Sequence, residues 1–187
     1  MRKIILSVIL ITILVLSVFS IYFQSEATAL GAHVVALKLD TGDTAWMIVA
    51  SALVLIMTPG LGFFYGGMVG KKNVISTMLQ SFMAMVIVTV LWVLVGFGLC
   101  FGPSVGGIIG DPSSNFMFNG VNSTTAWELA PTIPFILFAF FQAKFAIITP
   151  ALITGAFAER VRFWAYLLFM VLFILVIYAP LCHMTWH

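Results

Sequence analysis

The chain contains very little charge. Only 7% of its 187 residues are Asp, Glu, Lys or Arg, whereas 63% are hydrophobic. Ordinary soluble domains are about one quarter charged, so a water-exposed globular domain is excluded. The formal net charge of +2 is small and its basic residues are scattered, which also excludes a nucleic-acid-binding surface. The composition therefore predicts an all-α integral membrane protein, in contact with lipid.

Cysteine is equally scarce. Cys100 and Cys182 are too few for a disulfide scaffold, and neither has the His and Cys spacing of a metal site nearby. Both lie near predicted outer ends of helices, so they are either free thiols or a single bridge formed in an oxidising compartment. The chain also lacks an evident nucleophile, carboxylate pair or phosphate loop. We therefore expect neither an enzyme nor a bound cofactor.

Long apolar stretches make up most of the chain. A transmembrane helix needs about 20 mostly apolar residues, and four stretches reach that length: 45–69, 74–101, 131–158 and 163–182. Residues 1–29 begin with Arg2 and Lys3, continue as an apolar run and end in Ala-Thr-Ala. That layout indicates a signal peptide or an uncleaved N-terminal anchor helix. Residues 30–44 carry charges and are predicted to form an exposed extracytoplasmic linker.

Basic residues determine the predicted orientation. Two lysines follow the first span and two arginines follow the third, whereas loop 102–130 contains neither residue type. Cytoplasmic loops collect Lys and Arg. We therefore expect loops 70–73 and 159–162 to be cytoplasmic, and loop 102–130 to be extracytoplasmic together with the carboxyl end around Trp186.

A glycine strip runs along the end of the first span. Gly62, Gly66 and Gly70 recur four residues apart and so share one helix face. Small residues let a neighbouring helix approach closely within a bilayer. The strip predicts helix packing in preference to a substrate contact.

The third span contains polar residues that need an explanation. Phe141, Gln142 and Phe145 share a face; such a face either packs against lipid and protein or, because a buried amide is costly, meets another helix or water. Lys144 points about 100° away from Phe145. It either snorkels towards an interface or has a functional role.

The fourth span ends in aromatic and imidazole groups. Tyr178 and Trp186 are typical interfacial anchors. His183 and His187 are four residues apart, a spacing that can share a metal or a proton. Because no third ligand is near them in the sequence, they do not predict a metal site.

In order, these segments resemble the ammonium transporter family, the Amt, Mep and Rhesus proteins. The resemblance covers residue 43 to the last residue and is carried by several long motifs. They are Asp43-Thr44-Ala45-Trp46, Met57 to Met68 (MTPGLGFFYGGM), Lys72-Asn73-Val74, Phe141-Gln142 with Phe145, Ile148 to Ile153 (ITPALI), Gly155 to Arg160 (GAFAER) and His183-Met184-Thr185-Trp186.

The resemblance implies a helical bundle of an expected eleven transmembrane helices, of which 45–187 is the N-terminal part with the first four. It implies a homotrimer in the plasma membrane, a PII-type cytoplasmic regulator, and transport of ammonium or ammonia. It further implies that Phe145 is an outer gate, that Trp186 supplies the indole of an external recruiting site, and that Phe141 and Gln142 adjoin this site. Aromatic faces would hold the cation there, and ammonia would then cross a hydrophobic pore.

Two alternatives stay open, because the family's aspartate, pore histidines, second gating phenylalanine and site hydroxyl come from later segments. One is a truncated or split membrane product without transport activity. The other is an ammonium sensor module.

The proposed contact between Phe145 and Trp186 requires a particular geometry. Straight helices would raise Trp186 about 36 Å and Phe145 about 20 Å above the inner ends of their helices. We therefore expect the chain to turn back near Pro180, or the helices to tilt.

Overall fold

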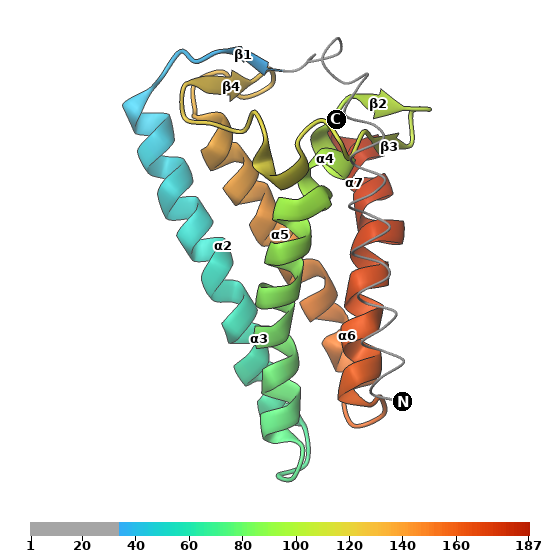
Figure 1. The fold of residues 1–187 in the computed structure, drawn as a ribbon. Helices are drawn as coiled ribbons and strands as arrows, with labels where there is room; N and C mark the ends of the chain where they lie inside the picture. The colour runs from blue at the N-terminus through green and yellow to red at the C-terminus, as the bar shows by residue number, and fades with distance from the viewer. Residues whose placement is uncertain (1–33) are drawn as a thin grey trace.

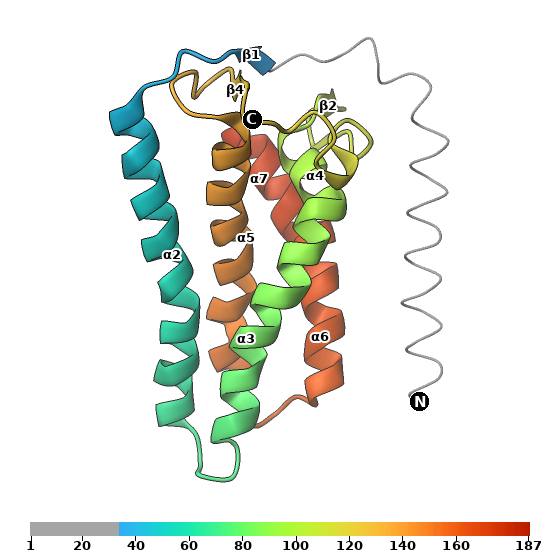
Figure 2. The ribbon, with the colours of Figure 1, turned by 60° about the vertical axis from the view of Figure 1, so that its left-hand side comes forward.

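The computed structural model describes residues 34–187, and the predicted signal peptide or anchor at 1–29 lies outside them. Within this part of the chain, four helical runs are long and apolar enough to cross a membrane. They stand side by side as one bundle (Figures 1 and 2). The prediction of a helical membrane bundle with four spans is thereby confirmed. The runs are α2 (Thr41–Met68), α3 to α4 (Val74–Phe101), α5 (Phe135–Phe157) and α6 to α7 (Phe163–Trp186).

Helix α2 begins earlier than predicted, at Thr41 rather than residue 45. Asp40 caps it, because its side chain accepts a hydrogen bond from the backbone N–H of Asp43 at 2.8 Å. Part of the predicted linker 30–44 is therefore helical. The apolar pattern did not predict this start, because the first turn of α2 is polar and lies outside the hydrophobic run.

The glycine strip packs against α3 (Val74–Leu91), as predicted. A Cβ added to Gly62 would lie 3.4 Å from Ser81 Cβ, and one added to Gly66 would lie 2.8 Å from Met78 Cγ. Gly70 differs, because it lies beyond the end of α2, where an added Cβ would meet Glu159 instead. Two of the three glycines therefore serve helix contact, and the third serves a turn.

The second span is not a uniform α-helix. After α3 the chain forms a π-helical segment, η2 (Trp92–Gly96), and then α4 (Phe97–Phe101). The N–H of Phe97 donates to the carbonyl of Trp92, five residues back. Pattern analysis predicted only the outer limits of this span, 74–101, and those limits are confirmed.

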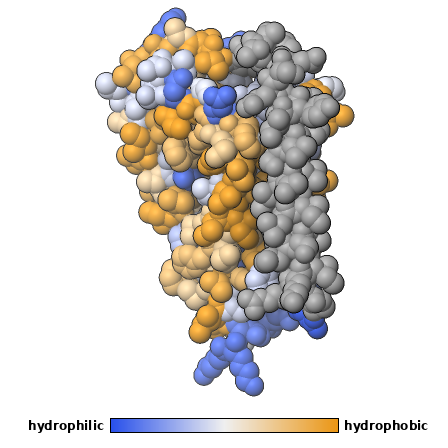
Figure 3. Space-filling model, in the orientation of Figure 1, coloured by the Kyte–Doolittle hydropathy of each residue, from blue (hydrophilic) through white to orange (hydrophobic). Residues whose placement is uncertain are grey.

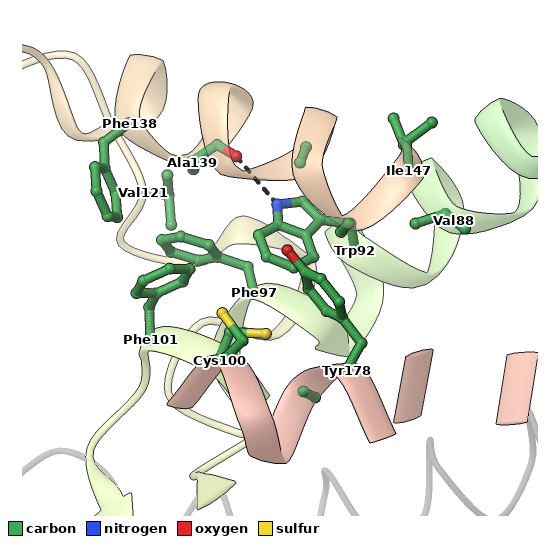
Figure 4. Packing of buried hydrophobic residues seen from close by; sticks show 14 of the residues in the cluster. Val88, Trp92, Phe97, Cys100, Phe101, Val121, Phe138, Ala139, Ile147 and Tyr178 are labelled. Atoms are coloured by element: carbon green, nitrogen blue, oxygen red, sulfur yellow. Dashed lines mark hydrogen bonds between the residues drawn. The ribbon is translucent and has the colours of Figure 1, made fainter. Parts of the chain in front are cut away.

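The Trp92 indole lies at the centre of the largest buried cluster (Figure 4). Its N–H donates to the carbonyl of Ala139 in α5 at 3.1 Å. Phe97 and Phe101 pack around it edge-on, with centroids 5.9 and 6.3 Å away, and Tyr178 lies 6.5 Å away. These rings join the second, third and fourth spans near one end of the bundle.

Short strands cover that end of the bundle (Figure 1). Strand β1 (Val34–Ala36) pairs antiparallel with β4 (Thr125–Trp127), with Val34 opposite Trp127 and Ala36 opposite Thr125. Strands β2 (Ser104–Val105) and β3 (Ile109–Gly110) form a second pair, and the 3₁₀ turn η3 (Phe116–Phe118) follows. The predicted loop 102–130 is therefore folded, and α5 begins at Phe135, not at 131. We call this end, which also holds Trp186, the loop end.

The opposite end, which we call the basic end, carries the turns 69–73 and 158–162. The basic residues of these turns are Lys71, Lys72, Arg160 and Arg162. Figure 3 shows hydrophilic residues gathered at this lower end, below a largely apolar face. The charge pattern assigned the basic turns and loop 102–130 to opposite sides of the membrane, and they lie at opposite ends of the bundle.

The fourth span contains a second π-helical segment. Helix α6 (Phe163–Leu172) passes into η4 (Phe173–Tyr178) and then α7 (Ala179–Trp186). The chain does not turn back near Pro180, so the predicted reversal there is wrong. The fourth span continues to Trp186, so its predicted end near residue 182 is wrong as well. Pro180 is tolerated because it occupies the first turn of α7, directly after a π segment in which the Ala179 N–H bonds to the carbonyl of Ile174.

Candidate functional site

Three aromatic rings form a line at the loop end, between α5 and α7. The centroids of Phe141 and Phe145 are 5.1 Å apart with an interplanar angle of 76°. Phe145 and Trp186 are 6.0 Å apart at 77°. The structure thus brings together the residues singled out from the sequence, on two different spans. Phe141 and Phe145 are partly buried, whereas Trp186 is 45% exposed.

Phe145 and Trp186 are in contact, although straight helices would place the two residues at different heights along the bundle. Helices α6 and α7 lean towards the upper end of α5 (Figure 2), which is the tilt that the sequence argument offered as one solution. Side-chain direction helps, because the Cα–Cβ bond tilts towards the helix N-terminus. Since α5 and α7 run in opposite directions, Phe145 reaches up and Trp186 reaches down.

Gln142 lies beside this aromatic line and is under-satisfied. Its buried Oε1 atom has no hydrogen-bond partner among residues 34–187. The residue also lines a cavity of about 350 Å³ between the upper ends of α2 and α5, together with Asp43, Trp46 and Phe141. A buried amide without a partner is costly, so this oxygen is available to a polar ligand, to water or to a further segment of protein.

Lys144 faces away from the aromatic line. Its Nζ lies 5.5 Å from the centroid of the Phe140 ring, and Phe140 in turn packs edge-on against Phe118 of η3 at 6.1 Å. The ammonium group therefore lies on a different side of α5 from Trp186. Because Phe140 lies nearer the loop-end start of α5, this geometry favours the interpretation in which Lys144 snorkels towards the interface.

Cys100 and Cys182 are both buried and both free thiols. They belong to the same cluster as Trp92, at the contact between α4 and α7. The bridge left open by the sequence is therefore not formed, and the pair packs as small apolar side chains.

The loop end carries more carboxylates than basic side chains. Within residues 34–44 and 102–134, the loop end carries one lysine and four carboxylates: Lys38, Asp40, Asp43, Asp111 and Glu128. An excess of carboxylates at the mouth of a site raises the local concentration of cations.

Comparison with known proteins identifies relatives of the chain. The sequence model of the Ammonium Transporter Family matches residues 45–187. An ammonium transporter of Mycobacterium bovis is 49% identical over 157 residues, covering 77% of this chain and 33% of the relative. One from Aquifex aeolicus is 41% identical over 178 residues, covering 92% of this chain and 38% of the relative. The chain therefore spans about a third of the length of these relatives.

Solved structures give the same result. The crystal structure of Candida albicans Mep2 matches with a TM-score of 0.70 and 34% identity, over 80% of this chain and 32% of that one. A sensor Amt protein matches with a TM-score of 0.67 and 31% identity, over 76% of this chain and 33% of that one. The two sequence relatives are named ammonium transporters and the second structure is named a sensor, and none of these three is named as an enzyme. By its sequence model, its relatives and its fold, the chain belongs to the ammonium transporter family.

Proposed function

We propose that this chain is the N-terminal part of a membrane protein that transports ammonium or ammonia, and that Phe141, Phe145 and Trp186 recruit the cation at the outer face. The observation that carries the proposal is the contact between the Phe145 and Trp186 rings, 6.0 Å apart across two spans. A cation held against aromatic faces gains about 2 kcal/mol or more when it is desolvated.

The line of rings has the properties that such a step needs. Trp186 is partly open to solvent, so a hydrated cation can reach its indole. Phe145 lies one helical turn further from the loop end along α5 than Phe141, which is the position proposed for the gate. The Gln142 oxygen supplies an acceptor for an N–H group released from water. Passage beyond Phe145 is then proposed to occur as ammonia, because a bare charge in hydrocarbon is costly.

The same proposal includes orientation and assembly. The loop end is extracytoplasmic and the basic end cytoplasmic, in a plasma membrane, as the positive-inside rule predicts. Helix α2 is the least covered span, with 11% of its apolar window buried, which supports a contact with further helices or with other subunits of a homotrimer. A PII-type regulator would bind at the basic end.

Uptake of radiolabelled methylammonium by the full-length protein tests the site. Phe145→Ala and Trp186→Leu are expected to raise the half-saturation concentration by about tenfold or more, since a lost contact of about 1.4 kcal/mol corresponds to a factor of ten. Matched controls are Phe140→Ala, on the Lys144 side of α5, and Trp164→Leu, 57% exposed on α6. Normal half-saturation in both site variants would remove the assignment and leave the fold intact.

The sensor alternative is distinguished by the rest of the gene. A sensor Amt protein shares this fold at nearly the same similarity as Mep2, so the described spans suit either role. A coding sequence that continues past residue 187 with an Asp-Phe-Ala-Gly-Gly-like stretch and two histidine-bearing helices supports transport. An immediate stop supports a truncated product, and an appended signalling domain supports a sensor.

A further inference from the structure

The last turn of α7 is attached to the second span by one buried side chain. His183 is 3% exposed, and its two ring nitrogens contact two different segments. Nδ1 lies 2.9 Å from the carbonyl oxygen of Cys100 at the end of α4. Nε2 lies 3.0 Å from the hydroxyl oxygen of Ser104 in β2. This single imidazole therefore connects α7 to both α4 and the strand that follows it.

The partners determine the tautomer of the ring. A carbonyl oxygen can only accept a hydrogen bond, so Nδ1 carries the proton and donates to Cys100. In the neutral ring Nε2 is then an acceptor, and the Ser104 hydroxyl donates to it. Both ring nitrogens therefore have a hydrogen-bond partner.

The position of Trp186 depends on this attachment. Among residues 34–187 the indole of Trp186 makes no hydrogen bond, and its one close ring neighbour is Phe145. Its place is therefore determined by the backbone of the last turn of α7. His183 precedes it by three residues, less than one helical turn. The preceding segment of the span is the π-helical η4, so the α-helical hydrogen-bond pattern is interrupted directly before α7.

A second contact strengthens the same turn. The ring of His187 stacks on the ring of His183, with centroids 4.2 Å apart and an interplanar angle of 27°. His187 also lies 5.9 Å from the ring of Trp127 in β4. The end of α7 is thus enclosed by α4, β2 and β4, and Trp186 projects from that enclosure towards α5.

We infer that His183 is a positioning residue for cation recruitment: by holding the end of α7 to the carbonyl of Cys100, it keeps the Trp186 indole against Phe145. The inference rests on the proposed function and adds to it a residue that does not touch the cation. Loss of the attachment should loosen the pair of rings, so it should weaken capture of the cation more than the maximal rate of transport.

The test is the concentration dependence of methylammonium uptake by the full-length protein. His183→Ala should raise the half-saturation concentration about threefold to tenfold, as expected for losing one or two hydrogen bonds, at a maximal rate little changed per molecule in the membrane. His183→Asn keeps an N–H donor near the Nδ1 position and loses the Ser104 contact. It should fall between His183→Ala and the natural protein, and Ser104→Ala should match it.

Thr185→Val is the matched control. It lies in the same turn, but its hydroxyl donates within the helix to the carbonyl of Leu181 at 2.7 Å, so uptake should be normal. An unchanged half-saturation in His183→Ala, or an equal rise in Thr185→Val, would overturn the inference. If His183→Ala does not reach the membrane, unchanged half-saturation in both His183→Asn and Ser104→Ala would overturn it instead. A normal Trp186→Leu would instead contradict the proposed site, so the two failures can be told apart.

Discussion

The carboxylate of Glu159 accepts a hydrogen bond from the backbone N–H of Gly70 at 2.8 Å, linking positions 89 residues apart in the chain. The same oxygen accepts a second bond from the Asn73 side chain at 3.0 Å. Glu159 has a φ of 65°, a left-handed conformation that is uncommon for a non-glycine residue. At the basic end, the turn after α5 is therefore held to the turn after α2 by one strained, exposed glutamate.

This contact predicts a pH dependence of stability. Hydrogen bonds, first from Asn73 and then from Gly70, lower the pKa of Glu159 from its ordinary value of 4.5. Because the folded pKa is the lower one, the stabilisation is complete above about pH 4.5 and is lost as the pH falls through the folded value. Thermal unfolding in detergent between about pH 7 and pH 3 should show a steeper decline for the natural protein than for Glu159→Gln.

The control for that experiment is Asp43→Asn, which removes an exposed carboxylate at the loop end. It should leave the acid decline as steep as in the natural protein. A decline that is equally steep in Glu159→Gln would mean that the contact does not stabilise the folded state.

Trp92→Phe is expected to destabilise the bundle by about 1–3 kcal/mol, because it removes the donor to the Ala139 carbonyl and leaves space in the buried cluster. Denaturant unfolding of the purified protein in detergent measures this change. Trp164→Phe is the matched substitution, 57% exposed on α6, and should change the free energy of unfolding by about 0.5 kcal/mol or less. Equal effects would contradict the central role of the Trp92 indole.

Two glycines in equally close contact should respond differently to alanine. An added Cβ at Gly155 would lie 2.8 Å from Tyr65 Cε1, and one at Gly66 would lie 2.8 Å from Met78 Cγ. The Tyr65 ring is rigid and is fixed by its hydroxyl, which donates to the Leu152 carbonyl at 2.8 Å, whereas a methionine side chain can rearrange. Gly155→Ala should therefore cost about 1–3 kcal/mol, and Gly66→Ala less than about 1 kcal/mol.

The comparison uses the same unfolding assay for both variants. Adding Tyr65→Ala should relieve most of the loss caused by Gly155→Ala, because the clashing ring is gone. No relief in the double variant would show that the clash lies elsewhere.

Lys144→Met should leave methylammonium uptake nearly unchanged. The Lys144 ammonium lies over Phe140, on a different side of α5 from the Trp186 indole, so its charge does not act directly on a cation held there. We expect the half-saturation concentration to stay within about twofold of that of the natural protein, since the ammonium group is directed over Phe140 and away from the Trp186 indole. A large fall in this concentration would instead show that Lys144 repels the cation from the site.

The spans and the shared face of Phe141 and Phe145 could be predicted from the sequence, because each depends only on residues that are close together in the chain. The limits of the second span, 74–101, follow from an apolar run, and Phe141, Gln142 and Phe145 share a helix face by spacing alone. The meeting of Phe145 and Trp186 was expected from the family resemblance, and the contact of their rings is confirmed. Their role in binding a cation stays a proposal.

Features that depend on distant contacts were missed. The pairing of β1 with β4 joins three-residue strands about 90 positions apart, too short to carry a periodic pattern. The π segment η4 looks like any other apolar stretch in the sequence, so Pro180 was misread as a point of reversal. His183 was considered only for sharing a metal or a proton with His187, because its partners, Cys100 and Ser104, come from another part of the chain.

The pairing of β1 with β4 also limits how the chain can be processed. Residues Val34 to Ala36 provide the partner edge for the strand that holds Trp127 over the end of the bundle. A protease cut after residue 29, as the signal-peptide interpretation requires, would leave this edge whole. A cut after residue 36 would remove it, so a mature amino terminus beyond that residue is incompatible with the β1–β4 pairing at the loop end.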